Sequence, residues 1–269
     1  MASANSLSSR ETVIRVGQGT LAFLTPELDG TMTYHPYPVK SGMSLAANLR
    51  MAFKDEEYLA DLSGRATLCV ASPVVLIPAD EYNATDDFDS EAIYSEVITG
   101  HKGEKKITRE LPELNAVALF TVNSDLLLVV NDHFRRVEVQ NVMVPVWTAL
   151  YDSHYQAAGA RRLFAYFHDK KVDIFAFEQH RIDFANSFDA FHAHDALYFI
   201  LFIWKQRGMN QKEDELFVAG TPPHADWLMK RLRTYLSNVH EINRDDEPAT
   251  AQAYQPEHGK PLDLSMICG

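Results

Sequence analysis

Apolar runs at the start of the chain predict three strands followed by a helix. Residues 12–18 and 19–25 form two such runs, and the glycines between them supply the positive φ angles that a tight hairpin turn needs. A third strand is expected at residues 30–37. Ser44 then has the character of a helix N-cap, because apolar side chains recur at helical spacing after it. A buried strand at residues 65–71 closes this first unit.

The same order of elements returns in the second half. Apolar runs at residues 163–168 and 172–177 flank a polar turn, a third strand is expected at 181–187, a helix opens at Asp195, and a strand follows at 215–219. The turn precedes the helix by 26 residues in both halves, from position 18 to 44 and from 169 to 195. The pattern therefore predicts a duplicated β-β-β-α-β-α unit. Chance stays the alternative, because many α/β proteins contain a hairpin followed by a helix.

The remaining patterns predict how the two units are connected and completed. Strands are expected at 74–77, 107–111, 116–122, 137–144 and 238–242, and helices after Pro78, before residue 98, and at 124–134, 145–156 and 225–236. We expect a first lobe over residues 11–135 and a second over 136–243. Residues 244–269 are polar, contain three prolines and end in an apolar cluster, which is typical of a mobile tail.

Composition and charge narrow the class of protein. A chain of 269 residues with 46% hydrophobic residues can bury a large core, while a net charge of −12 disfavours nucleic acid and anionic membrane surfaces as partners. The two cysteines, Cys69 and Cys268, cannot build a disulfide framework. The polar start has no apolar signal region, and the longest apolar stretch, residues 196–204, is too short to cross a bilayer. We expect a cytoplasmic protein without membrane insertion.

Several segments resemble a known family in order and spacing. They are residues 195–201, 206–209, 215–220 and 232–239, together with Leu76, Ile77, Pro78 and Tyr82. The resemblance is to domain of unknown function 3822, which is associated with an actin-like ATPase fold, and it spans residues 12–242. It implies a two-lobed α/β fold of the ribonuclease H-like type. At the level of fold it extends to the cytoplasmic adaptor proteins of pilus and type II secretion assembly. The helix from Asp195 is apolar nearly all round, which favours cover on most of its sides.

The resemblance also implies where a nucleotide would bind. Actin-like ATPases hold phosphate at the two hairpin turns, where an Asp followed by glycines lets the backbone approach and helps to place Mg²⁺. Here the first turn has Gly17 and Gly19 without an Asp, the second has Asp169 and Lys170 without a glycine, and a glycine pair near the adenosine is reduced to Gly220. These five residues are the candidates for the cleft. Each also has a plain structural explanation as a turn residue.

Two groups of histidines and acidic residues have side chains of the types that bind Zn²⁺. Glu178 and His180 lie two residues apart on a strand, and His192, His194 and Asp195 gather at a helix start. Two histidines at a spacing of two do not share a helix face, and Asp195 suits a helix N-terminus for structural reasons. We therefore predict no metal ligands.

Two functions follow from these patterns. The first is a non-catalytic binding or adaptor module with a protein partner, degenerate nucleotide-binding loops and no cofactor, ATP and Mg²⁺ being disfavoured. The alternative is a divergent nucleotide-dependent ATPase or kinase that uses the inter-lobe cleft with Asp169 as the metal ligand. A hydrolase with Ser, His and Asp residues brought together by the fold stays open as well, and the tail beyond residue 244 is a candidate partner-binding segment.

Overall fold

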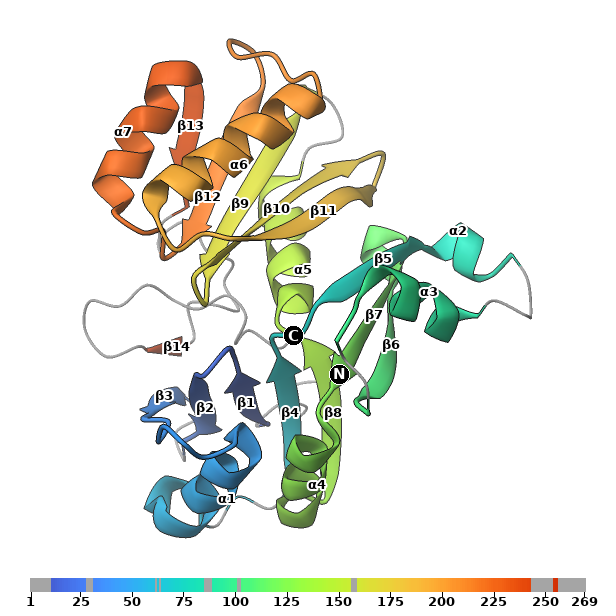
Figure 1. Cartoon of the computed structure of the whole chain (residues 1–269), viewed down its shortest axis with the longest axis vertical. Helices are drawn as coiled ribbons and strands as arrows, with labels where there is room; N and C mark the ends of the chain where they lie inside the picture. Colours follow the sequence, from blue (N-terminus) through green and yellow to red (C-terminus); the bar gives the residue numbers. More distant parts are fainter. Residues whose placement is uncertain are drawn as a thin grey trace, which may run out of the picture.

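Two lobes of similar construction stack along the long axis of the molecule (Figure 1). The computed structural model describes residues 11–27, 31–60, 62, 64–84, 89–100, 103–155, 159–242 and 254–255. Most elements predicted from the sequence are present within one to three residues of their expected bounds, including the helix that Ser44 caps by accepting a hydrogen bond from the Ala47 N–H at 3.1 Å. The duplicated two-lobed α/β architecture is confirmed.

The first lobe is built on a mixed sheet with the strand order β14-β3-β2-β1-β4-β8. Its strands are β1 (Thr12–Val16), β2 (Leu21–Pro26), β3 (Met32–Tyr37), β4 (Arg65–Val70), β8 (Arg136–Asn141) and β14 (Tyr254–Gln255). Helices α1 (Leu45–Asp55) and α4 (Ser124–His133) cover one face of the sheet (Figure 1). Alternation along β1 sends Ile14 into that core and Val13 to the opposite face, which looks toward the second lobe.

A small third sheet is inserted into the first lobe between β4 and α4. It has the antiparallel order β5-β7-β6, and short helices lie beside it (Figure 1). Its elements are β5 (Val74–Pro78), α2 (Ala79–Tyr82), α3 (Ser90–Val97), β6 (Lys105–Leu111) and β7 (Ala116–Val122); two short 3-10 turns lie at η1 (Glu57–Leu59) and η2 (Pro112–Leu114). The insertion separates β4 from α4, so the first copy of the repeat is interrupted and the second is continuous.

The second lobe repeats the strand order of the first. Its sheet is β11-β10-β9-β12-β13, which matches β3-β2-β1-β4-β8 strand for strand and direction for direction. The elements are β9 (Arg162–His168), β10 (Lys171–Glu178), β11 (Arg181–Asp189), α6 (Ala193–Gln206), β12 (Glu215–Gly220), α7 (Ala225–Tyr235) and β13 (Asn238–Glu241). Helices α6 and α7 cover its outer face (Figure 1).

The strand order changes two expectations about where the first lobe ends. Strand β8, expected in the second lobe, pairs in parallel with β4, as β13 does with β12, so the first sheet extends beyond residue 135 to Asn141. Residues Tyr254 and Gln255, expected in a mobile tail, pair in parallel with β3. The rest of the tail, including the apolar cluster proposed to bind a partner, lies outside the described residues.

Helix α5 (Met143–His154) joins the lobes and forms their shared core. Its buried residue Trp147 lies in one hydrophobic cluster with Val13 of the first sheet and with Phe164 and Phe175 of the second. The inward faces of both sheets therefore pack on one helix, and side chains of those faces meet between the lobes.

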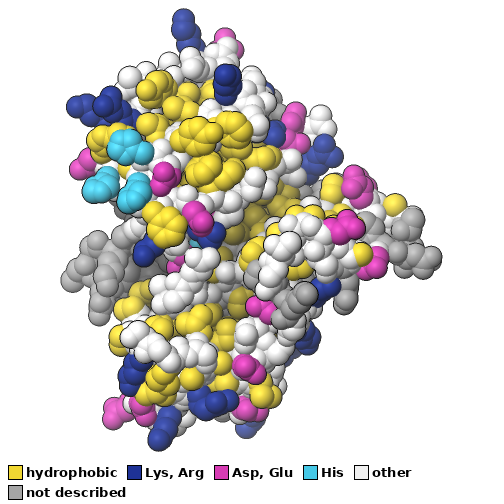
Figure 2. All heavy atoms as spheres, viewed as in Figure 1, with side chains coloured by type: hydrophobic (Ala, Val, Ile, Leu, Met, Phe, Trp, Pro, Cys, Tyr) yellow, Lys and Arg dark blue, Asp and Glu magenta, His cyan; other side chains and the backbone are white. Residues whose placement is uncertain are grey.

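Helix α6 is less covered than its composition suggested. Its inner positions are buried against the second sheet, but Tyr198 is 61% and Phe202 is 40% exposed, and their rings stack on the surface. Hydrophobic side chains gather over this part of the upper lobe (Figure 2). The prediction that α6 is covered on most of its sides is therefore wrong for these two aromatic residues. No helix in the described ranges is long and apolar enough to span a membrane.

Candidate functional site

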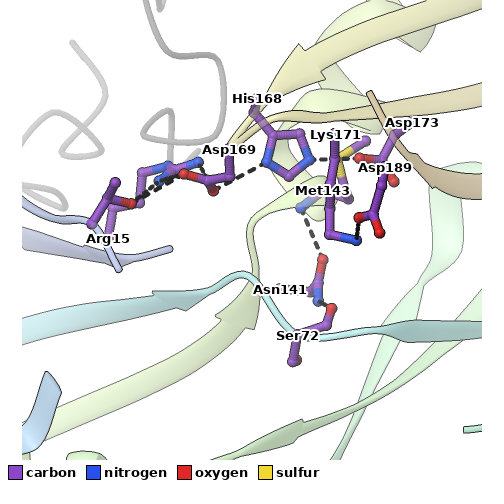
Figure 3. A network of polar contacts seen from close by, with 10 residues as sticks. Arg15, Ser72, Asn141, Met143, His168, Asp169, Lys171, Asp173 and Asp189 are labelled. Atoms are coloured by element: carbon purple, nitrogen blue, oxygen red, sulfur yellow. Dashed lines mark hydrogen bonds and ion pairs between the residues drawn. The ribbon is translucent and has the colours of Figure 1, made fainter. Parts of the chain in front are cut away.

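The turns of the two equivalent hairpins meet between the lobes through an ion pair. Nη2 of Arg15, at the end of β1, lies 2.7 Å from Oδ2 of Asp169, in the turn between β9 and β10 (Figure 3). Oδ1 of the same carboxylate accepts a hydrogen bond from the Thr20 hydroxyl at 3.1 Å and lies 3.4 Å from Nη1 of Arg15. The side chains of Arg15 and Asp169 are each 6% exposed. The pair therefore bridges the lobes away from solvent.

Alternation along the strands explains why these polar side chains point at one another. Arg15 is two residues after Val13, so it projects from the inward face of the first sheet. His168 follows Phe164 and Tyr166 at even spacing, and Asp173 precedes Phe175 in the same way, so both project from the inward face of the second sheet. The polar cluster thus lies at one edge of the shared core.

His168 continues the network into the second lobe. Its Nδ1 lies 3.2 Å from Oδ2 of Asp169, and its Nε2 lies 2.5 Å from Oδ2 of Asp173 (Figure 3). The side chain of His168 is 7% exposed, and that of Asp173 is 11% exposed. Two cations and two carboxylates therefore alternate in one buried row from Arg15 to Asp173.

The surroundings shift the pKa values of the two central groups in opposite directions. Burial alone would lower the pKa of His168, but its hydrogen bonds and attraction to Asp169 and Asp173 raise it to about 9. Burial alone would raise the pKa of Asp169, whereas His168 and Arg15 hold it well below its usual range. At neutral pH His168 is an imidazolium and Asp169 a carboxylate, so the row has no net charge.

This arrangement limits the chemistry of its members. The carboxylate of Asp169 is engaged at both oxygens by Arg15, Thr20 and His168, so a metal ion bound there would have to displace these contacts. Both ring nitrogens of His168 face carboxylates. Because a general base needs a nitrogen free to take a proton from a nucleophile, His168 in this geometry cannot activate a serine.

Two cavities flank the polar row. One, of about 270 Å³, lies beside His168 and Asp173 and is bordered by the start of α5 and by β11. The other, of about 410 Å³, lies beside Arg15 and Asp169 and is bordered by Tyr34, Tyr37 and Gly220. Asp169 and His168 border both cavities, so the network divides the space between the lobes.

The structure brings four of the five predicted cleft residues together. Gly17 packs so closely at the ion pair that a Cβ there would lie 2.7 Å from both Arg15 and Asp169. Gly19 and Gly220 border the larger cavity with Asp169. Lys170 points elsewhere, because its ammonium lies 6.0 Å from the centre of the exposed Phe191 ring. Lys170 lies in the turn between β9 and β10 with a positive φ, and it lines neither of the two cavities.

Gly220 allows the close approach of two neighbouring strands. Its φ is +82°, and a Cβ on it would lie 2.2 Å from the carbonyl oxygen of Phe167 in β9. Replacing Gly220 by alanine is expected to lower the free energy of unfolding by about 1–3 kcal/mol more than replacing Gly19, because overpacking adds to the cost of a left-handed backbone.

Gly19 is the matched control for this substitution. It also has a positive φ, of +72°, but no described residue lies within 4 Å of a Cβ placed there. Urea denaturation of both variants, followed by circular dichroism, measures the difference. Equal losses of stability would contradict the close-packing explanation for Gly220.

Three of the five residues considered for a metal have structural partners. Nδ1 of His180 lies 3.1 Å from the Tyr151 hydroxyl, the His194 ring packs on Trp227, and Asp195 completes a capping box at the start of α6. Among the residues that the structure describes, no group of three or more His, Cys, Asp or Glu side chains is placed to hold a metal ion.

Arg15, Thr20, His168 and Asp173 were not among the residues singled out from the sequence. A usable signal exists for three of them, because Arg15, His168 and Asp173 interrupt or end otherwise apolar runs of buried strands. A charged residue in such a run needs a partner when it is buried. The sequence does not say which partner, since Arg15 and Asp169 lie 154 positions apart.

Comparisons with known proteins agree with this architecture. The chain resembles a protein from Bacteroides thetaiotaomicron with an actin-like ATPase fold and unknown function, at 21% identity and a TM-score of 0.75, over 94% of this chain and 98% of that one. It also resembles a chain of the PilM–PilN type IV pilus biogenesis complex, at 11% identity and a TM-score of 0.54, over 93% and 91% of the two chains. No curated protein matches the sequence. Residues 4–239 match DUF3822, a protein of unknown function, and the chain therefore belongs to the DUF3822 family.

Proposed function

We propose that this protein is a non-catalytic binding or adaptor module that keeps the actin-like architecture but has a degenerate nucleotide site. The observation that carries the proposal is the buried ion pair between Arg15 and Asp169, which links the two hairpin turns. In this fold those turns are where phosphate and Mg²⁺ are expected. A carboxylate saturated by an arginine, a hydroxyl and an imidazolium is a poor metal ligand, and we propose that no nucleotide cofactor is used.

The exposed aromatic surface of the second lobe supports a protein partner. Phe191, Tyr198 and Phe202 are 58%, 61% and 40% exposed, and the rings of Tyr198 and Phe202, both on α6, stack on each other. Aromatic residues are enriched in the parts of protein interfaces that contribute most to binding. The fold-level similarity to a chain of a pilus assembly complex is consistent with an adaptor role. A cytoplasmic location fits the buried Cys69, which forms no disulfide in the described part of the chain.

A ligand-dependent melting experiment tests the proposal. The full chain is expected to show no saturable rise in melting temperature with Mg-ATP up to about 10 mM, because a ligand that binds only the folded state must stabilise it. A dissociation constant of about 100 μM would give about 2.7 kcal/mol at that concentration. MgCl₂ with inorganic triphosphate is the control for ionic effects, and a saturable rise specific to Mg-ATP would refute the proposal.

The alternative, a divergent ATPase or kinase with Asp169 as its metal ligand, requires the ion pair to open. It predicts ATP turnover that Asp169→Ala abolishes. The contacts of Asp169 favour the binding module, because opening the pair would leave Arg15 buried without its carboxylate.

A further inference from the structure

The smaller cavity between the lobes has walls from both of them. The first lobe contributes the connection from β4 to β5 and the start of α5, and the second contributes the β9–β10 hairpin and part of β11. Its volume of about 270 Å³ corresponds to roughly nine water molecules. A small organic molecule therefore fits where the lobes face each other.

The charges around this cavity cancel. Arg15 and His168 balance Asp169 and Asp173 in the buried row, and the ammonium of Lys171 lies 2.9 Å from a carboxylate oxygen of Asp189. Among the described side chains a charged ligand would find no uncompensated partner, and burying an unpaired charge is costly. The cavity thus favours an uncharged molecule.

One carboxylate oxygen of Asp173 can accept a further hydrogen bond. Oδ2 of Asp173 faces His168, while among the described residues Oδ1 has no hydrogen-bond partner. Asp173 borders the cavity, and its side chain is 11% exposed. A carboxylate oxygen accepts more than one hydrogen bond, so Oδ1 can take an N–H or O–H from a ligand.

Two further polar atoms near the cavity are unsatisfied. Oγ of Ser72 and Nε1 of Trp147 are buried without a hydrogen-bond partner in the described part of the chain, and both residues border the cavity. Buried polar groups are normally paired, and exceptions call for an explanation. Both atoms are covered by protein, so a ligand in the cavity would reach them only after a change of side-chain rotamer.

Part of the cavity lining is apolar. Val74 and Leu76 of β5 line the cavity together with Met143 and Trp147 of α5. Most binding sites for small molecules combine a mainly apolar wall with a few converging polar groups, which fix the orientation of the ligand. The cavity has both parts within one small volume.

We propose that this cavity binds an uncharged small molecule that donates an N–H or O–H hydrogen bond to Asp173 and packs an apolar body against Val74, Leu76 and Trp147. The inference rests on the proposed function, since it names a ligand class for the cleft of a non-catalytic module. It requires the polar row to stay closed, because His168 holds Asp173 in place.

Three matched probes test the ligand class: benzamide, benzoate and benzylamine. They share an aromatic ring and differ in charge, being neutral, anionic and cationic. Titrated into the ¹⁵N-labelled full chain, benzamide is expected to shift the indole N–H signal of Trp147, one of three tryptophans, in a saturable way. Benzoate and benzylamine are expected to bind at least about tenfold more weakly. Equal binding of a charged probe, or no shift with benzamide at 20 mM, would overturn the proposal.

A blocking variant tests the location. Ala185→Phe places a ring at the β11 border of the cavity and is expected to weaken benzamide binding at least about tenfold. Ala160→Phe, at an exposed alanine outside the cavity lining, is expected to leave binding unchanged. Should Ala185→Phe fail to fold, nuclear Overhauser contacts between benzamide and the methyl groups of Val74 and Leu76 in the natural chain decide the question. Their absence at saturation would refute the location.

The two proposals fail in different ways. A saturable stabilisation by Mg-ATP would refute the non-catalytic module and with it the assignment of its cleft. Absence of benzamide binding together with absence of Mg-ATP binding would refute only the ligand assignment.

Discussion

Replacing Asp169 by alanine is expected to lower the free energy of unfolding by about 3–5 kcal/mol, because the substitution leaves a buried arginine without its carboxylate. Arg15 and Asp169 are both 6% exposed and lie 2.7 Å apart. His168 loses one of its two carboxylate partners at the same time. Urea denaturation followed by circular dichroism at pH 7 measures the change.

Asp189→Ala is the matched control for this prediction. Asp189 also pairs with a cation at 2.9 Å, but its side chain is 63% exposed, so its loss is expected to cost less than about 1 kcal/mol. A loss at Asp169 no larger than the loss at Asp189 would mean that the lobes do not depend on the buried pair. Arg15→Met, alone and combined with Asp169→Ala, completes a double-mutant cycle that gives the coupling energy of the two side chains.

The local pattern of the chain was enough to predict most of the elements and the repeat. Two apolar runs around a short turn predict a hairpin, and Ser44 predicts the start of a helix. Both patterns depend only on residues that are close in the sequence. The equal spacing from turn to helix in the two halves reflects equivalent strands, β1 with β9 and β2 with β10.

The features that the sequence did not predict depend on contacts between residues far apart in the chain. Strand β8 follows a helix and precedes another, so its local pattern fits either lobe, and only its pairing with β4 assigns it to the first. The inserted sheet has ordinary strand signals, but which strands pair within it is decided in space. In the same way Asp169 was predicted as a cleft residue, whereas its partner Arg15 became evident only when the two hairpins were seen facing each other.

The buried row also predicts how stability depends on pH. The pKa of His168 is raised from 6.5 to about 9, so in this window the folded protein binds more protons than the unfolded chain and stability falls as pH rises. The contribution of His168 is complete below about pH 6.5 and is lost through pH 9, a decline of about 3 kcal/mol at 1.36 kcal/mol per pH unit. The lowered pKa of Asp169 affects stability at acidic pH, because the stability that Asp169 contributes is lost as its carboxylate becomes protonated.

Comparison with His168→Gln isolates this effect from the other ten histidines. Glutamine cannot take up a proton, so the stability advantage of the natural chain over this variant is expected to shrink by about 3 kcal/mol between pH 6.5 and pH 9.5. Urea denaturation of both proteins at half-unit steps of pH measures it. Parallel curves across this range would show that His168 is not held as an imidazolium between Asp169 and Asp173. The row would then carry a net negative charge at neutral pH, and the preference of the adjoining cavity for uncharged molecules would lose its physical basis.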